Sequence, residues 1–357
     1  MIYCNKCGKE LPDDAYFCSA CGQRTSRAEE EGVPARQDLS TLEGSIETMV
    51  SQAVRTIEET VRSATEEART GSWGDNRYRA EEERVLTGPV DAERLLLEVV
   101  SRNGKINVDT WDKPEYKIVL LIKAWGYTQE EADRNLKALI VDFKEAEVDG
   151  LKRLSLGFDH PARRISYSVR VDATLPKGVE TALNLKTSNG SINIAEIEGS
   201  DLNLDTSNGK ITMEKVTAEK LEGRTSNGRV VLDRVSAPVL KVRTSNGRIE
   251  GELRSRDAYL KTSNGTITLI LPCDEGGNYE LLTSNGSIDL DVSDDPDNGY
   301  DVDLTTSMGR ITVDIPGMEY LSSKKNHVEA KTRGFDEKGK KTGVIAKTSM
   351  GKIVIHA

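Results

Sequence analysis

Four cysteines near the start of the chain have the residue type and the spacing of a metal site. They form the pattern Cys-x2-Cys-x10-Cys-x2-Cys and are Cys4, Cys7, Cys18 and Cys21. Two residues between thiolates let one tight turn present both sulfurs, and four thiolates complete the closed tetrahedron of structural Zn²⁺. Two disulfides and a redox Cys-x-x-Cys pair are the alternatives. The two matched pairs, in a chain with no recognisable secretion signal, favour zinc.

So short a segment cannot fold on a core of its own, so metal binding should supply its folding free energy. The stretch Cys4–Gly22 resembles the zinc ribbon at the N-terminus of many prokaryotic proteins. The resemblance implies zinc binding and protein contacts, and no particular activity. We therefore predict a zinc ribbon over residues 1–23. The fifth cysteine, Cys273, has no histidine nearby, which favours a core residue over a nucleophile.

Basic residues in the second half of the chain recur at fixed places and predict an anion-binding stripe. Each follows the glycine or precedes the threonine of a repeated tetrapeptide. The candidates are Lys210, Arg224, Arg229, Arg243, Arg248 and Lys261, with Arg310 in an equivalent position. Like charges stacked at strand spacing repel one another unless an anion covers them. The alternative is neutralisation by Glu222, Asp233, Glu250 and Glu252, which the net charge of −10 favours.

The tetrapeptide itself, Thr-Ser-Asn-Gly, is the strongest structural signal. Its six copies begin at Thr187, Thr206, Thr225, Thr244, Thr262 and Thr283. Two degenerate copies, Thr-Ser-Met-Gly, begin at Thr306 and Thr348. A period near 20 residues indicates one structural unit that is stacked repeatedly, and such arrays form surfaces or rods more often than catalytic pockets.

The residues around each copy alternate as in β-strands. Leu183, Leu185 and Thr187 lie on one parity, and Ile192 and Ile194 lie on the other. The Asn-Gly pair between them predicts a corner, because both residues tolerate positive φ. We therefore predict a mainly β fold, a β-helix solenoid with coils of 19–21 residues. The expected turn ladder consists of Asn189, Gly190, Asn208, Gly209, Asn227, Gly228, Asn246, Gly247, Asn264, Gly265, Asn285 and Gly286.

The rest of the chain is expected to link and cap this solenoid. Residues 24–84 predict a charged linker with an amphipathic helix at about 38–70. This helix is a self-associating coiled coil, a helix packed on the chain, or a helix that is only partly formed. Residues 85–180 predict an irregular cap whose short helix opens with a capping box at Thr128 and Glu131. Residues 181–357 predict regular coils, the last of which has no recognisable cap.

Residues 85–357 resemble a bacterial and archaeal β-helix family labelled "putative adhesins". The resemblance depends on Asn103-Gly-Lys-Ile106, on the strand–helix–strand insertion ending at Val171–Gly178, and on the Asn-Gly-x-Ile-x-Ile coils. It implies a right-handed or similar β-helix and no agreed activity.

Composition limits the function classes. With 357 residues, the chain has room for two or three domains, and its pI of about 5.2 argues against nucleic acid as a general partner. It contains no run of 18 apolar residues and no basic-then-apolar leader, which predicts no membrane span and a cytoplasmic location.

Three functions follow, and the leading one is a non-enzymatic scaffold or protein-interaction protein, in which the zinc ribbon recruits a partner or assembles a rigid β-helical rod. The second is a module that binds an anionic or glycan polymer. The third is a carbohydrate-active enzyme, which we rank last because the three histidines have no partner pattern. A scaffold needs self-complementary ends or a helical dimer, a binder needs arginines on one face that no acid neutralises, and an enzyme needs two or three acids on one concave face.

Overall fold

The computed structural model divides the chain into two units, Met1–Asp75 and Asn76–Ala357. The residues that it describes are 2–5, 8–11, 78–160 and 166–357. In the first unit β1 (Ile2–Tyr3) pairs antiparallel with β2 (Glu10–Leu11). The helix predicted at 38–70 lies outside the described residues.

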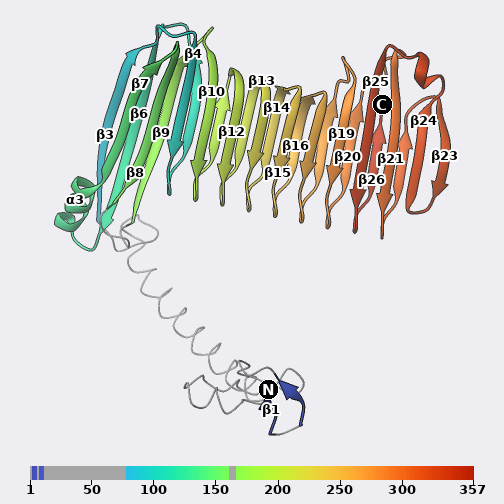
Figure 1. Ribbon diagram of the computed structural model, residues 1–357, viewed down its shortest axis with the longest axis horizontal. Helices are drawn as coiled ribbons and strands as arrows, with labels where there is room; N and C mark the ends of the chain where they lie inside the picture. The colour runs from blue at the N-terminus through green and yellow to red at the C-terminus, as the bar shows by residue number, and fades with distance from the viewer. Residues whose placement is uncertain (1, 6–7, 12–77, 161–165) are drawn as a thin grey trace, which may run out of the picture. The chain divides into compact units, whose positions relative to one another are not determined.

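The second unit is mainly β, with one long, largely parallel sheet that folds into two layers (Figure 1). We call the layers face one and face two. In spatial order, face one contains β7 (Ile140–Val148), β8 (Leu151–Asp159), β4 (Arg94–Val100), β10 (Glu180–Thr187), β12 (Glu198–Thr206), the second half of β13 (Ile211–Arg224), β15 (Val239–Arg243), β17 (Asp257–Lys261), β19 (Gly277–Leu282), β25 (Lys340–Thr348), β21 (Asn298–Thr306), β24 (His327–Thr332) and β23 (Met318–Lys324). Face two contains β3 (Tyr78–Pro89), β6 (Glu115–Gly126), β9 (Tyr167–Pro176), β5 (Ile106–Trp111), β11 (Ile192–Ala195), the first half of β13, β14 (Val230–Ser236), β16 (Ile249–Arg254), β18 (Ile267–Leu271), β20 (Ile288–Val292), β26 (Ile353–His356) and β22 (Ile311–Asp314).

The sequence period sets the strand register. Leu183 pairs in parallel with Leu202, Leu202 with Leu221, and Leu221 with Leu240. Each strand therefore lies beside the equivalent strand of the next repeat, and equivalent residues form rows that run across the strands. A period of two along each strand then places the leucines on one side of every rung and polar residues on the other.

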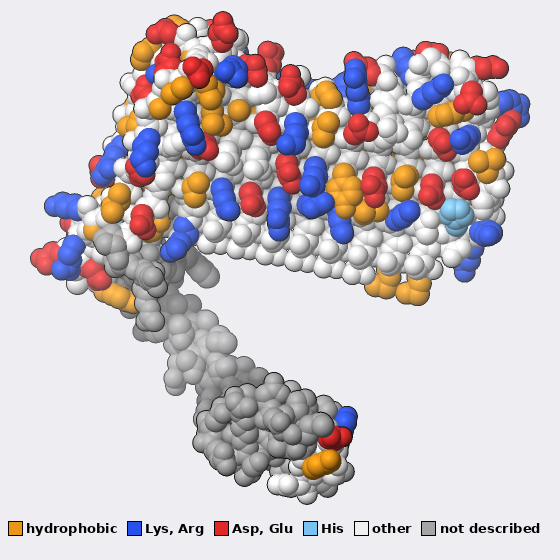
Figure 2. Space-filling model, in the orientation of Figure 1, with side chains coloured by type: hydrophobic (Ala, Val, Ile, Leu, Met, Phe, Trp, Pro, Cys, Tyr) orange, Lys and Arg blue, Asp and Glu red, His pale blue; other side chains and the backbone are white. Residues whose placement is uncertain are grey.

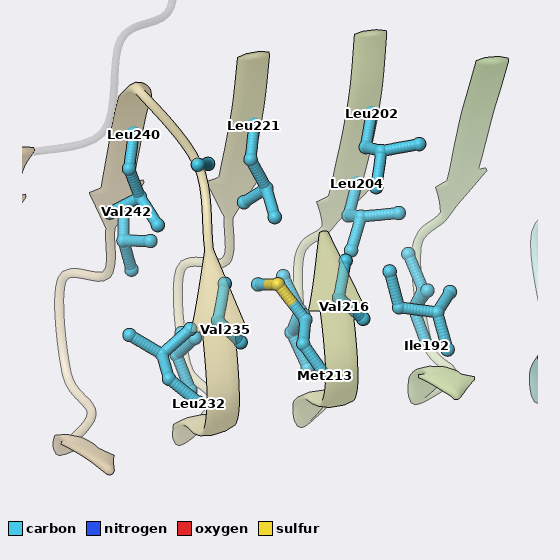
Figure 3. Packing of buried hydrophobic residues seen from close by; sticks show 14 of the residues in the cluster. Ile192, Leu202, Leu204, Met213, Val216, Leu221, Leu232, Val235, Leu240 and Val242 are labelled. Carbon is cyan, nitrogen blue, oxygen red and sulfur yellow. The ribbon is translucent and has the colours of Figure 1, made fainter. Parts of the chain in front are cut away.

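The core lies between the two faces (Figure 3). Leu202 and Leu221 of face one point toward Met213 and Leu232 of face two, and all four side chains are fully buried. Because each coil adds the same few aliphatic side chains, the core grows in length with the repeats and keeps a constant width.

The threonine of each tetrapeptide is part of this interior. Thr225 Oγ1 donates to Gly209 O at 2.9 Å, and Thr244 Oγ1 donates to Gly228 O at 2.9 Å. The same bond recurs in the other copies, at Thr187, Thr206, Thr262, Thr283, Thr306 and Thr348. Each buried hydroxyl thus satisfies a carbonyl of the neighbouring coil, which an aliphatic residue could not do.

The fourth position of the tetrapeptide requires glycine for a different reason from the one that we predicted. The tetrapeptide glycines do not have a φ in the left-handed region, so the positive-φ argument is wrong for them. A Cβ on Gly228 would instead lie 1.8 Å from Gly209 O, and one on Gly209 would lie 1.7 Å from Gly190 O. Successive backbones approach so closely at this corner that only glycine fits.

The asparagines form a hydrogen-bonded ladder on the outside of the same corner. Each Nδ2 donates to the Oδ1 of the preceding coil, as from Asn227 to Asn208 at 2.7 Å and from Asn246 to Asn227 at 2.8 Å. The full ladder consists of Asn103, Asn189, Asn208, Asn227, Asn246, Asn264 and Asn285. On the next rung Met350 takes the place of asparagine, because Met350 N donates to Ser284 O at 2.9 Å.

The N-terminal end of this unit begins earlier than expected. Residues 78–84, which we assigned to the charged linker, form the first part of β3, so that assignment is wrong. β3 pairs antiparallel with β6 along its whole length, and Glu81 faces Lys123 across the pair at 3.2 Å. The charged residues that suggested a linker lie on both sides of the strand: Glu81 and Glu83 are exposed, and the half-buried Glu82 and Arg84 pair with each other.

The predicted short helix is α3 (Gln129–Ala138). Thr128 Oγ1 caps it by accepting from Glu131 N at 3.1 Å. Ala132 and Leu136 join the core against β6 and β3. Among the described residues, no helix is long and apolar enough to cross a membrane.

The C-terminal end differs most from expectation. The last coil, β25 and β26, does not end the stack, so the prediction of an open end there is wrong. β25 lies between β19 and β21, and β26 lies between β20 and β22. On face two the stack ends at β22. On face one it ends at β24 and β23, an antiparallel pair whose register shifts at Leu321. A bulge of this kind on an edge strand discourages pairing with another molecule. A short 3₁₀ helix, η3 (Phe335–Glu337), precedes the last coil, β25 and β26.

Candidate functional site

The described part of the zinc ribbon is the turn that contains the first cysteine. Cys4 is buried at the end of β1, and Gly8 N donates to Cys4 O at 2.9 Å. Gly8 has a φ of 71°, a conformation that favours glycine. The turn therefore fits a cysteine knuckle. Three of the predicted ligands, Cys7, Cys18 and Cys21, lie outside the described residues.

The structure divides the candidate anion-binding residues between the two faces. Arg224 pairs with Arg243, and Arg243 pairs with Lys261, along face one. On face two, the main chains of successive residues that follow the glycine lie on neighbouring rungs, because Ile211 N donates to Arg229 O and Val230 N donates to Arg248 O. The Thr-Ser-Asn-Gly corner separates the two groups, so the stripe predicted from the sequence consists of two rows.

The face-one row contains the residue before the tetrapeptide threonine on each rung. Its cations are Lys186, Arg224, Arg243, Lys261 and Lys347, with Asp205 and Leu282 between some of them. In Figure 2 blue side chains follow one another in a line across the visible face. All five cations are exposed, and none forms an ion pair within the part of the chain that the structure describes. Arg243 lies over the ring of Tyr259, with 5.0 Å from Cζ to the ring centroid.

On face two, Arg229 and Arg248 share one carboxylate, whereas Lys210 and Arg310 are exposed and form no ion pair among the described residues. Arg229 Nη1 lies 2.9 Å from Glu250 Oε1, and Arg248 Nη1 lies 3.5 Å from Glu250 Oε2. Glu250 is one of the acids that we expected to neutralise the stripe. Two of the other expected acids form ion pairs with cations outside the row: Asp233 pairs with Arg234, and Glu252 pairs with Arg254. The neutralisation alternative therefore applies to Arg229 and Arg248, and not to Lys210 or Arg310.

Acidic residues accompany the face-one row on the side away from the corner. Glu222 pairs with Lys241 at 3.4 Å, and Glu280 is exposed two residues before Leu282. On the corner side the row is bordered by the neutral asparagine ladder. A single narrow track of positive potential thus runs across the strands, with no broad basic patch around it.

A shallow groove of about 600 Å³ opens beside this track over β15, β17, β19 and β25. Its walls include Val239, Tyr259 and Ile345, of which Val239 is 47% and Ile345 is 41% exposed. Gly343, which has no side chain, lies in the same groove. Val239, Tyr259 and Ile345 lie on three different strands, so the groove offers separate apolar contacts among polar side chains.

Four acids also line the groove, which bears on the enzyme alternative. They are Asp257, Glu280, Asp301 and Asp303. Asp301 lies 2.9 Å from Lys331, and their hydrogen bond raises the pKa of Lys331. Asp257 accepts from Asn278 Nδ2 at 3.1 Å. Both carboxylates therefore have polar partners within the described residues.

The fifth cysteine is not poised for nucleophilic chemistry. Cys273 is buried, and burial raises the pKa of its thiol. A thiol reacts as the thiolate, so a raised pKa makes the residue less reactive.

Sequence reasoning missed three residues of the face-one surface. Lys186 and Lys347 precede Thr187 and Thr348, so they have the same position in their repeats as Arg224. Their position directly before the threonine could therefore have identified both lysines from the sequence. Tyr259 precedes the tetrapeptide by three residues, and nothing in the sequence distinguishes it from other strand residues.

Comparison with known proteins agrees with the two-part architecture. Residues 154–355 match the family model described as toastrack DUF4097, and residues 3–24 match a zinc-ribbon domain. No match was found among curated proteins.

Solved structures of similar fold share little sequence. A "putative adhesin" from Bacteroides fragilis is 12% identical, with a TM-score of 0.40, and the match covers 77% of this chain and 97% of that one. A "putative lipid binding protein" from Parabacteroides distasonis is 13% identical, with a TM-score of 0.32 and coverage of 78% and 97%. A "putative cell adhesion protein" from Clostridium sporogenes is 12% identical, with a TM-score of 0.29 and coverage of 78% and 99%. The family resemblance predicted from the sequence is confirmed: the chain belongs to the DUF4097 toastrack family and has a zinc-ribbon domain at its N-terminus.

Proposed function

We propose that this protein is a non-enzymatic binding module that holds a linear anionic polymer along the face-one row. The observation that supports this most is that Arg224, Arg243 and Lys261 occupy consecutive rungs, are exposed, and form no ion pair within the described residues. By contrast, Glu250 neutralises the corresponding arginines of face two.

The cations of the face-one row repel one another, and no ion pair within the described residues relieves this repulsion. Like charges directly opposite one another on neighbouring strands destabilise a sheet. The chain keeps three of them in sequence although it is acidic overall, with a net charge of −10. A bound polyanion relieves this repulsion, so the row favours binding at a small cost to the stability of the free protein.

The leading scaffold hypothesis receives less support. It required self-complementary ends or a helical dimer, and the last coil lies inside the stack. The helix at 38–70 lies outside the described residues, and we propose the zinc ribbon as the contact with a protein partner. The toastrack domain would then act as a rigid β-helical rod that presents the anion-binding row.

The row is tested by charge removal on one face at a time. Arg224→Gln/Arg243→Gln should weaken the binding of labelled poly-L-glutamate to the full chain at least about tenfold at low salt, because each removed cation gives up a charge-assisted contact. Fluorescence anisotropy at several salt concentrations measures this, and the salt dependence should become shallower. The matched control is Arg229→Gln/Arg248→Gln, which removes the same charge from face two and should leave the affinity nearly unchanged.

Two outcomes would overturn the proposal. In one, the wild-type chain does not bind poly-L-glutamate at low salt. In the other, both double variants lose the same affinity, which would mean that only net charge matters. The melting temperature gives an independent reading, since the face-one variant should be at least as stable as wild type once the repulsion is removed.

Zinc is proposed for the ribbon, and its removal should act locally. Cys18→Ser should abolish stoichiometric zinc binding and unfold the ribbon, because the metal supplies the folding free energy of so small a domain. The thermal transition of the toastrack domain should not move, since Met1–Asp75 and Asn76–Ala357 form separate compact units. Metal analysis and calorimetry measure the two effects. A large shift of the main transition would show that the units fold together.

A further inference from the structure

We infer that the polymer on the face-one row is an extended peptide in which acidic and apolar side chains alternate. This inference rests on the proposed function and adds the class of partner. Its basis is that the cationic row and the apolar groove lie side by side over the same strands, β15 to β25.

The geometry of an extended chain suits this arrangement. Successive side chains of a β-strand point to opposite sides. A peptide that runs along the boundary between row and groove therefore directs one set of side chains to Arg243 and Lys261. The other set reaches Val239, Tyr259 and Ile345 in the groove. The row favours acidic side chains in the first set. The exposed aliphatic groups favour apolar side chains in the second set, and the four acids that line the groove keep acidic side chains out of it.

The length of the row sets the length of the peptide. From Arg224 to Lys347 the row crosses five strands, β13, β15, β17, β19 and β25. Four strand spacings of about 4.8 Å each give about 19 Å, which an extended peptide covers with about six residues. Six residues supply three acidic side chains for the row and three apolar ones for the groove.

Other polyanions fit the same surface less well. Single-stranded nucleic acid binds through several aromatic side chains on which bases stack, and the groove and row together offer Tyr259 and the largely buried Tyr279. A duplex or an anionic membrane presents charge over a wide surface. Glu222 and Glu280, beside the row, would face that charge and repel it. An acidic polysaccharide or polyphosphate has nothing to place against the exposed Val239 and Ile345.

The arginines agree with a carboxylate partner. A guanidinium offers two parallel N–H donors that match the two oxygens of a carboxylate. Arg243 already stacks on Tyr259, which leaves its donor edge free to bind a carboxylate while its face covers the ring.

The test compares two labelled hexapeptides on the full chain at low salt. Glu-Leu-Glu-Leu-Glu-Leu should bind at least tenfold more tightly than Glu-Ser-Glu-Ser-Glu-Ser, because only the first buries apolar side chains. The groove variant Val239→Thr/Ile345→Thr keeps the β-branched shape and should remove most of that difference. Binding of Glu-Ser-Glu-Ser-Glu-Ser should be the same on wild type and on this variant.

The outcomes separate this inference from the function on which it rests. If poly-L-glutamate binding depends on Arg224 and Arg243 but both hexapeptides bind alike, the peptide inference is wrong and the proposed function stands. Tighter binding of polygalacturonate or polyphosphate than of Glu-Leu-Glu-Leu-Glu-Leu would also overturn it. If no polyanion binds through the row, both fail. Retention of the tenfold difference by Val239→Thr/Ile345→Thr would exclude the groove as the apolar contact.

Discussion

Deletion of residues 340–357 should unfold the C-terminal third of the toastrack domain. The deletion removes β25 and β26, which separate two other coils, so β19 and β21 lose a partner along their whole length. It also removes Val344, Ala346, Ile353 and Ile355 from the core. Each large aliphatic side chain contributes about 1.5–3 kcal/mol by burial, and an entire domain is stable by only about 5–15 kcal/mol.

Limited proteolysis and thermal melting measure this effect. Residues 293–339 should become sensitive to protease, and the main transition should fall or split. A synthetic peptide with the sequence of residues 340–357, added to the truncated chain, should restore protection, whereas a scrambled peptide should not. A truncated chain that melts like the full chain would show that β19 and β21 close the gap by pairing directly.

Gly228→Ala should strongly destabilise the repeats although it adds a single methyl group. The new Cβ would lie 1.8 Å from Gly209 O, and that oxygen belongs to the backbone and accepts from buried Thr225. Neighbouring coils must separate to admit the methyl group, so we expect a loss of about 3 kcal/mol or more in the free energy of unfolding.

The matched control lies on the preceding strand. Gly223→Ala places its Cβ 3.2 Å from Met213 Cε, the end of a flexible side chain that can move. Its cost should therefore stay near about 1 kcal/mol. Chemical denaturation of both variants compares the two values. Equal losses of unfolding free energy in the two variants would mean that the close approach of the backbones at the corner does not decide the cost of adding a methyl group.

Much of the fold could be predicted from the repeat. The period fixed which residues pair, as Leu202 with Leu221, and the alternation placed Thr225 on the inner side. These features depend on local spacing, which a sequence displays directly. The glycine at position 228 could be predicted as well, but for a wrong reason, because the approach of Gly209 O is a contact between coils and leaves no local mark.

The order of the coils could not be predicted. Every coil offers its neighbours the same pattern of strand and corner, so the copy at Thr348 fits beside Thr283 as well as beside Thr306. Only the antiparallel hairpin formed by β23 and β24, which occupies the far side of β21, settles the order. A second corner of the coil could not be predicted from the sequence either. Glu196, Lys215 and Arg234 have φ values of 53°, 51° and 55°, and none is a residue type that favours this conformation.

The candidate site was predictable residue by residue but not as a surface. Arg224 and Arg229 look alike in sequence, since both border the same tetrapeptide. The corner between them places Arg224 on face one and Arg229 on face two. Of these two residues, only Arg229 forms an ion pair with Glu250. Distinguishing a neutralised row from an open one therefore requires knowing which acids share a face.

The asparagine ladder has a consequence for how such a chain can change its length. Every asparagine between the two ends of the ladder, Asn103 and Asn285, both accepts and donates one amide hydrogen bond, as Asn227 does between Asn208 and Asn246. A duplicated or lost repeat therefore brings or removes one donor together with one acceptor, and the ladder closes again without an unpaired group. Met350, which neither donates nor accepts such a bond through its side chain, ends the series. Repeat number in this lineage can thus vary by whole units, and with it the length of the track on face one.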